Sequence, residues 1–277
     1  MATLFWFTIR QSVRLRKLWL SLLLLAGPSV LVLLIRYFEE PDRIEHVIRL
    51  YRFPMMFMLF PVVLPLVCML YGSGLIGSEV EGRTIVYLVT RRIRRETVLL
   101  VRFVAVALFL TALLSLAVTA LHLCAILGLD LARLNELSDR ATDRVWDPWH
   151  DLAYYLRAVP FAVAAFLAVF TLVSLTLPRP LIISVVYLVL IELIVSNMPL
   201  RAQIYTINHQ LRRMMTAAIP GLMNGLRHRP DRSLLEVLYP PGETGTLPLI
   251  VVILAALGLC CLVVKRFELM PAKVGRD

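Results

Sequence analysis

Six long apolar runs, separated by short charged segments, dominate the pattern of the chain. A helix needs about 20 consecutive apolar residues to cross the hydrocarbon core of a bilayer, and the runs are close to that length or longer. Because an α-helix satisfies its own backbone hydrogen bonds, the runs predict an all-α integral membrane protein with one transmembrane domain over residues 1–277. The predicted spans are 18–36, 54–78, 98–128, 156–177, 181–198 and 247–264.

Two of these spans contain residues that membrane helices usually avoid. Pro61 and Pro65 lie one helical turn apart in the second span, so we expect that span to kink. Glu192 interrupts the fifth span, where an acid costs about 2.5 to 3.5 kcal/mol on insertion scales and should face the protein interior. Two interpretations of Glu192 are open: a neutral carboxyl bonded to a neighbouring helix, or part of a substrate path that includes the two prolines.

The distribution of charge orients the spans. Basic residues exceed acidic ones by the full net charge of +10 on the side that holds both ends of the chain and segment 79–97. By the positive-inside rule this side is cytoplasmic. The excess should attract anionic lipid headgroups and not nucleic acid, because the basic residues flank membrane spans. With 59% hydrophobic and 17% charged residues, the chain is too apolar for an ordinary soluble protein.

The segments outside the spans differ in character. Residues 1–17 predict a helix that lies in the membrane interface, and residues 265–277 form a basic cytoplasmic tail. The last outer loop, 199–246, should hold one or two helices on or dipping into the outer face, where a basic rim could draw an anionic substrate or contact lipid headgroups. The outer segment 130–157 contains aromatic residues that predict an interfacial belt: Trp146, Trp149, Tyr154 and Tyr155.

A run of small residues from Gly72 to Gly77 formally matches the GxGxxG pattern of nucleotide-binding proteins. That pattern binds a nucleotide only after a strand in a soluble crossover unit, whereas this run lies within an apolar helix. We therefore expect it to let helices approach closely. The four cysteines all lie within predicted spans and are interpreted as small buried apolar residues: Cys68, Cys124, Cys260 and Cys261.

An alternative function, as a membrane-embedded enzyme or copper-maturation factor, rests on a few soft ligands. A methionine-rich run begins at Met55, and His122 lies near Cys124; thioether and thiolate groups select Cu(I). However, His122 and Cys124 are two residues apart and do not share a helix face. The chain has no HExxH, CxxC or P-loop motif, so we expect no catalytic residue, metal or cofactor.

Segment 79–97 is the most distinctive polar stretch of the sequence. Thr84 can cap a short helix in which Ile85, Leu88 and Val89 share one face, with Arg91 at its rim. A helix this short is unstable alone in water. It therefore needs a partner surface.

The run from Gly77 to Arg95, GSEVEGRTIVYLVTRRIRR, resembles the loop between the second and third spans of type 2 ABC exporter permeases. In that family an acidic residue, a Gly or polar residue, Thr, Leu and then Thr-Arg-Pro-Ile-x-Arg follow one another. Arg92 takes the place of the proline in this chain. The N-terminal interfacial helix, the six spans, the large last outer loop and the basic tail also match the family.

The resemblance implies a permease subunit of the cell membrane that works in export with a second permease chain, identical or different. A separate ABC ATPase subunit would dock on the loop helix and hydrolyse ATP, so the permease itself would not be an enzyme. The residues that would make this coupling contact are Glu79, Glu81, Arg83, Thr84, Ile85, Leu88, Val89 and Arg91.

Overall fold

The computed structural model describes residues 6, 8–10, 15–38, 44–73, 95–127, 147–177, 179–198, 201–218 and 246–267. Within these ranges almost every residue is helical and none forms a strand; η marks the π- and 3-10-helical stretches. The elements are α2 (Leu15–Phe38), α3 (Ile44–Phe53), η1 (Pro54–Val63), α4 (Leu64–Gly72), α7 (Arg95–Ile126), α9 (Pro148–Thr176), α10 (Pro180–Tyr187), η2 (Leu188–Ile194), η3 (Val195–Asn197), η4 (Arg201–Tyr205), α11 (Ile207–Ala218) and α13 (Thr246–Phe267).

Six helical stretches are long and apolar enough to cross a membrane, which confirms the predicted number. They are Lys17–Phe38, Leu50–Gly72, Glu96–Ile126, Pro148–Thr176, Pro180–Asn197 and Thr246–Lys265. Large apolar side chains on α2, α10 and α13, such as Leu23, Ile182 and Leu254, are exposed and suit a lipid environment. The protein is therefore an all-α, multi-pass membrane protein.

The fourth span begins well before the apolar run that marks it in the sequence. Asp147 caps α9, because its carboxylate accepts the N–H groups of Trp149 and His150, and Pro148 occupies the first helical position. The helix therefore starts at Pro148, ahead of the predicted 156. The expected aromatic belt is wrong for Tyr155, which is fully buried, whereas Trp149 is exposed.

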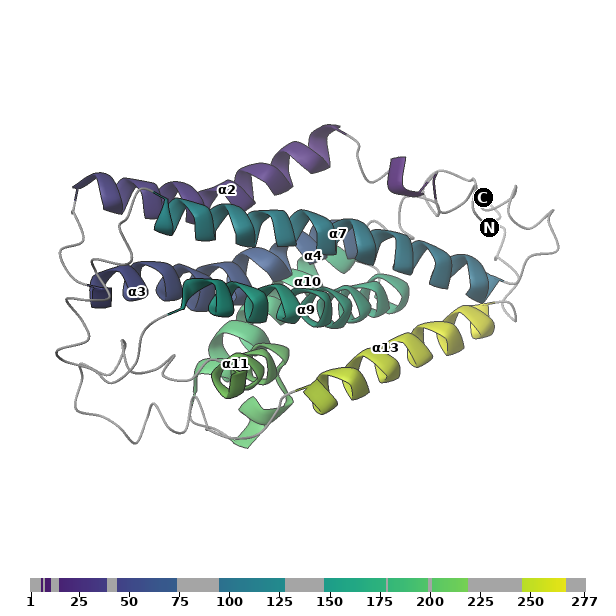
Figure 1. Cartoon of the computed structure of the whole chain (residues 1–277). Coiled ribbons are helices and arrows are strands. Elements are labelled where there is room, and N and C mark those ends of the chain that lie inside the picture. The colour runs from purple at the N-terminus through teal and green to yellow at the C-terminus, as the bar shows by residue number, and fades with distance from the viewer. Residues whose placement is uncertain are drawn as a thin grey trace.

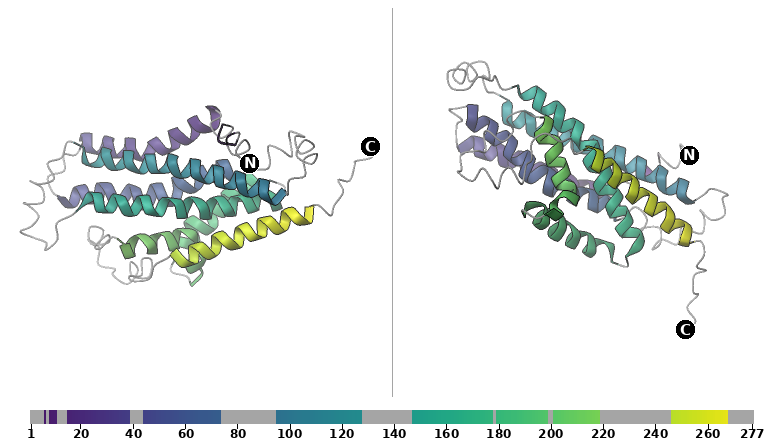
Figure 2. Two further views of the ribbon diagram at one scale, coloured as in Figure 1. Left: turned by 45° about the vertical axis from the view of Figure 1, so that its right-hand side comes forward. Right: turned by 90° about the horizontal axis from the view of Figure 1, so that it is seen from below.

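Helix α9 lies at the centre of the bundle. It packs against α7, α4, α13 and α11, and α2 covers α7 on the far side (Figures 1 and 2). Its buried face is rich in small side chains, which let neighbouring helices come close: Ala158, Ala162, Ala165 and Ala168. Phe166 and Phe170 fill the remaining space with stacked rings whose centroids are 6.2 Å apart.

Gly72 marks a close approach between α4 and α9. A Cβ atom at this position would lie 2.9 Å from the Cβ of Phe170, so a larger side chain cannot enter without displacing α9. Next to it, the Ser174 hydroxyl donates to the carbonyl oxygen of Ser73 at 3.2 Å. The prediction that small residues here bring helices together is confirmed at Gly72 and Ser73; residues 74–77 of that run lie outside the described residues.

Three segments predicted outside the spans are described only in part. In residues 1–17, Trp6 and residues 8–10 are helical, and α2 already begins at Leu15. Residues 74–94, which include all eight residues predicted to couple to an ATPase, lie outside the described residues. Segment 199–246, the predicted outer loop, contains η4 and α11, in line with the expected helix there; residues 199–200 and 219–245 lie outside the described residues.

Candidate functional site

The second and fifth spans each contain a π-helical stretch, whose turns are wider than those of an α-helix. These stretches, η1 and η2, contact each other. The expected kink of the second span takes this form because Pro61 and Pro65 cannot donate backbone hydrogen bonds, and a wide turn makes room for their rings. Since π-helical turns inside α-helices often mark functional sites, we take the meeting point of η1 and η2 as the candidate site.

Glu192, on η2, lies at this meeting point. It is fully buried, which confirms the prediction that it faces the interior. Its Oε1 accepts the Tyr187 hydroxyl at 2.9 Å and the N–H of Ile207 at 3.1 Å, and its Oε2 accepts the N–H of Asn208 at 2.9 Å. Both carboxyl oxygens thus face donors, an arrangement that compensates the cost of burying an acid.

The carboxylate of Glu192 caps the N-terminus of α11. The first N–H groups of a helix have no partner within the helix itself, and in α11 Glu192 accepts those of Ile207 and Asn208. The next one, from His209, is accepted by the hydroxyl of Thr206 at 3.3 Å. A negative charge also suits the positive end of the helix dipole. Glu192 therefore fixes where α11 begins and holds it against the fifth span.

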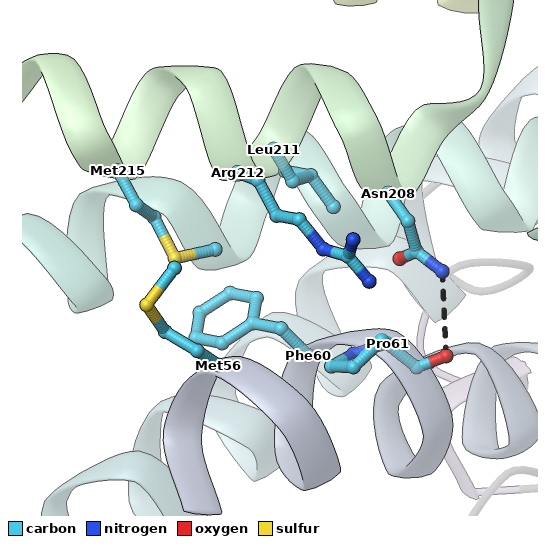
Figure 3. Close-up of a pocket in the computed structure, with 7 residues that line it drawn as sticks. All are labelled: Met56, Phe60, Pro61, Asn208, Leu211, Arg212 and Met215. Atoms are coloured by element: carbon cyan, nitrogen blue, oxygen red, sulfur yellow. Dashed lines mark hydrogen bonds between the residues drawn. The ribbon is translucent and has the colours of Figure 1, made fainter. Parts of the chain in front are cut away.

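The side chain of Asn208 links the two π-helical stretches. Its Nδ2 donates to the carbonyl oxygen of Glu192 at 3.1 Å and to that of Pro61 at 3.4 Å (Figure 3). In an α-helix the Pro61 carbonyl would be bonded by the residue four positions later, but that residue is Pro65, which has no N–H. Asn208 thus satisfies a carbonyl that the proline leaves without its regular donor. We call this set of residues the α11 junction: Pro61, Tyr187, Glu192, Ile207 and Asn208.

Beside the α11 junction, α11 and η1 enclose a narrow slot. The side chains that line it pack too closely to admit a water molecule: Met56, Phe60, Pro61, Asn208, Leu211, Arg212 and Met215. Arg212 is the charged residue of this lining; it is only 4% exposed and donates to Asn197 Oδ1 at 2.8 Å. Figure 3 shows its guanidinium reaching between the two helices, next to Asn208.

The electrostatics around α11 are dominated by positive charge. Burial, with the nearby Arg213 and Arg212, lowers the pKa of His209 to about 4, so this imidazole is neutral at physiological pH. Its position in the first turn of α11 disfavours a proton for the same reason that it favours the Glu192 carboxylate. The first turns of α11 therefore carry a neutral histidine and two arginines, next to the buried Glu192 of η2.

The structure brings some of the predicted path residues together and leaves one aside. Pro61 and Glu192 meet at Asn208, whereas Pro65 is buried in α4 and does not line the slot. Sequence reasoning missed Tyr187 and Asn208. The available signal was the polar, basic segment 207–218 after an apolar span, but the pattern does not reveal which of its side chains turns inward.

A second buried polar cluster lies where α3 and α9 begin to pack. Arg52 donates to Asp151 Oδ2 from Nε at 3.0 Å and from Nη2 at 2.7 Å, and both side chains are almost fully buried. Tyr51 packs against the rings of Tyr155 and His122 beside this pair. The pair ties α3 to α9, so this cluster has an evident structural role.

Metal and thiol chemistry find little support in the described ranges. They contain no group of three His, Cys, Asp or Glu side chains that could hold a metal ion. The four cysteines are free thiols, with Cys68 and Cys260 buried. His122 is enclosed by the rings of Tyr51 and Trp149, with centroids 5.1 and 5.2 Å away.

Comparison with known proteins adds no family to this picture. No protein-family model matches the chain, and no curated protein matches it.

Proposed function

We propose that this protein is the membrane-spanning permease subunit of an ABC exporter in the cell membrane, with both chain ends and segment 79–97 in the cytoplasm. The observation that carries the proposal is the placement of the family-like run 77–95 between the second and third of six spans. ATP hydrolysis belongs to a separate ATPase subunit, because the chain has no Walker motif. A second permease chain completes the transporter.

In this proposal the ATPase acts on the second span. Segment 79–97 follows α4 and leads into α7, so a force on it is applied to the ends of both helices. At Gly72, α4 is packed too closely on α9 to slide freely, whereas the wide turns of η1 offer a place to bend. Asn208 connects that place to the fifth span. The α11 junction is therefore suited to pass a movement of the second span to the fifth.

Copurification tests the proposed partner. The permease would be coexpressed with candidate ABC ATPase subunits, as the parent, as Leu88→Asp and as Arg91→Ala. Leu88→Asp places a carboxylate in a desolvated contact. This should abolish binding of micromolar affinity, which corresponds to about 8 kcal/mol of binding free energy. Arg91→Ala should retain the ATPase, because an exposed charge pair contributes about 0 to 1 kcal/mol. If Leu88→Asp retains the ATPase as fully as the parent, the docking assignment is wrong.

A further inference from the structure

Glu192 is a fully buried acid inside a membrane span, and acids in such places usually have a function. The side chains beside it are closely packed: the slot that Pro61 and Asn208 help to line does not admit a water molecule. A molecular ligand therefore finds no room in that slot, whereas a proton on Glu192 needs none.

The donors around Glu192 suit both forms of its carboxyl group. The N–H groups of Ile207 and Asn208 lie 3.1 Å from Oε1 and 2.9 Å from Oε2, and the Tyr187 hydroxyl lies 2.9 Å from Oε1. A backbone N–H group can only donate, so these two favour the carboxylate, which accepts at both oxygens. A hydroxyl can donate or accept. Tyr187 can therefore accept the O–H of a protonated Glu192 through the same contact.

The charged and ionisable groups that act on Glu192 come from α10 and α11. Tyr187 on α10 is bonded to it, and Arg212 on α11 acts on it electrostatically. His209, in the first turn of α11, is neutral at physiological pH. The elements η1 and η3, which also pack on η2, have no ionisable side chain. Burial favours the neutral form of an acid, whereas N–H donors and a nearby cation favour the charged form, and Glu192 experiences both influences.

We propose that Glu192 is a reversible proton-binding site and that its protonation releases α11. The carboxylate holds the first N–H groups of α11 and suits the positive end of the helix dipole. Protonation removes the charge, so both N–H bonds become weaker. Proton binding and docking of α11 therefore oppose each other. Local opening of α11 gives the carboxyl group access to water.

Release of α11 would reach the second and fifth spans through Asn208. This side chain bonds to the carbonyl oxygens of Pro61 and Glu192, so it links η1 to η2 only while α11 is docked (Figure 3). The proton would thus control the connection between the two π-helical stretches. The proposal does not require an ATPase, so it stands or falls separately from the proposed function.

Infrared spectroscopy tests proton binding directly. Spectra of the full chain in neutral maltoside micelles would be recorded from about pH 9 to about pH 4, a range that covers most carboxyl groups in proteins. The signal of Glu192 is the part of the parent spectrum that Glu192→Gln lacks. We expect its carboxylate band to be replaced by the C=O band of a protonated acid within this range. A signal that stays the same at every pH would overturn the proposal.

If Glu192→Gln does not yield folded protein, the parent alone provides the signal. Labelling with carbon-13 in the glutamate side chains separates glutamate bands from aspartate bands. Glu192 is fully buried, so its protonated C=O band should shift more slowly in D₂O than those of exposed glutamates. The same pH dependence is expected of this band, and its absence would again overturn the proposal.

Hydrogen exchange tests the release of α11. His209 also titrates in this pH range, so His209→Gln is compared with the double variant His209→Gln, Glu192→Gln. In His209→Gln, exchange at Ile207 and Asn208 relative to α9 should accelerate at least about fivefold as Glu192 is protonated, because α11 loses the charge at its N-terminus. The double variant should show the same ratio at every pH. A constant ratio in His209→Gln, or an equal change in the double variant, would show that the proton does not release α11.

Discussion

Asp151 and Glu192 are both buried acids in this membrane domain, and they are compensated by different partners. Asp151, in the first turns of α9, pairs with the guanidinium of Arg52 on α3 at 2.7 Å. Glu192, in η2, has no such cation bonded to it among the described residues; it accepts two backbone N–H groups of α11 and the Tyr187 hydroxyl. The acid is compensated by a bonded cation at the first site and by a helix N-terminus at the second.

This difference shows how the two sites can serve different purposes. Arg52 and Asp151 neutralise each other, and their pair links α3 to α9, so neither charge is available to bind a ligand. Glu192 instead accepts the first N–H groups of α11 and the Tyr187 hydroxyl, and its negative charge suits the positive end of the α11 dipole. The first site should therefore govern the stability of the whole bundle, and the second should govern the position of α11.

The largest effect is expected at the ion pair. Asp151→Asn leaves the Arg52 guanidinium buried without its counter-charge, which should lower the free energy of unfolding by about 3 to 5 kcal/mol. Unfolding in mixed detergent micelles would measure this loss. The control is Glu96→Gln, which breaks the exposed 3.5 Å pair with Lys265 and should cost about 0 to 1 kcal/mol. Equal costs for the two variants would contradict the assignment of the Arg52–Asp151 pair as a structural tie.

A smaller and more local effect is expected at Glu192. In Glu192→Gln an NH₂ group replaces one carboxyl oxygen and opposes a donor, so we expect a loss of about 1 to 3 kcal/mol. Hydrogen exchange should become faster at the amides of Ile207 and Asn208 and stay unchanged in α9. Tyr187→Phe, which removes one donor and leaves the backbone bonds intact, should cost about 0.5 to 1.5 kcal/mol and leave these amides protected. Unchanged exchange in Glu192→Gln would show that Glu192 does not cap α11.

The close packing of α4 on α9 can be tested at Gly72. Gly72→Ala forces a methyl group to within 2.9 Å of the Cβ of Phe170, so α4 and α9 should separate at a cost of about 1 to 3 kcal/mol. Gly258→Ala on α13 meets nothing within 4 Å and should be neutral or stabilising, because alanine is the better helix former. If both variants change the unfolding free energy with the same sign, α4 and α9 are not tightly packed at Gly72.

The smallest effect at neutral pH is expected at His209, and it grows on acidification. The folded-state pKa of about 4 lies below the ordinary value of 6.5, so between these values the unfolded chain binds more protons. Stability should therefore fall as the pH drops below about 6.5, with the loss complete below about pH 4. Unfolding temperatures of the parent and His209→Gln across this range would show it. A pH dependence that His209→Gln leaves unchanged must come from other groups.

The sequence predicts the architecture because a helix that crosses the lipid bilayer must be long and apolar. Each span needs a long apolar run, and every such run became a span. Helix starts were less predictable: α9 begins at Pro148 because Asp147 caps it and Arg52 compensates Asp151, and hydropathy registers neither effect. The burial of Tyr155 follows from that extension of the helix, since the residue faces Tyr51 and Phe60 across the bundle.

Only those candidate-site residues that are energetically costly in a membrane helix could be predicted from the sequence. An acid and two prolines in apolar runs stand out because each is expensive there. Their partners do not stand out, because Asn208 and Arg212 belong to a polar segment in which either face of α11 could have turned inward. Glu192 contacts residues 15 and 16 positions later, and such long-range contacts depend on how the fifth span ends and not on any periodicity.

ATP hydrolysis tests most directly whether a separate ATPase drives this membrane domain through segment 79–97. The ABC ATPase that copurifies with the parent permease would be assayed alone, with the parent permease in nanodiscs and with Leu88→Asp. We expect the parent permease to change the hydrolysis rate and Leu88→Asp to leave the rate at that of the ATPase alone. A rate with Leu88→Asp equal to that with the parent permease would contradict the proposed coupling.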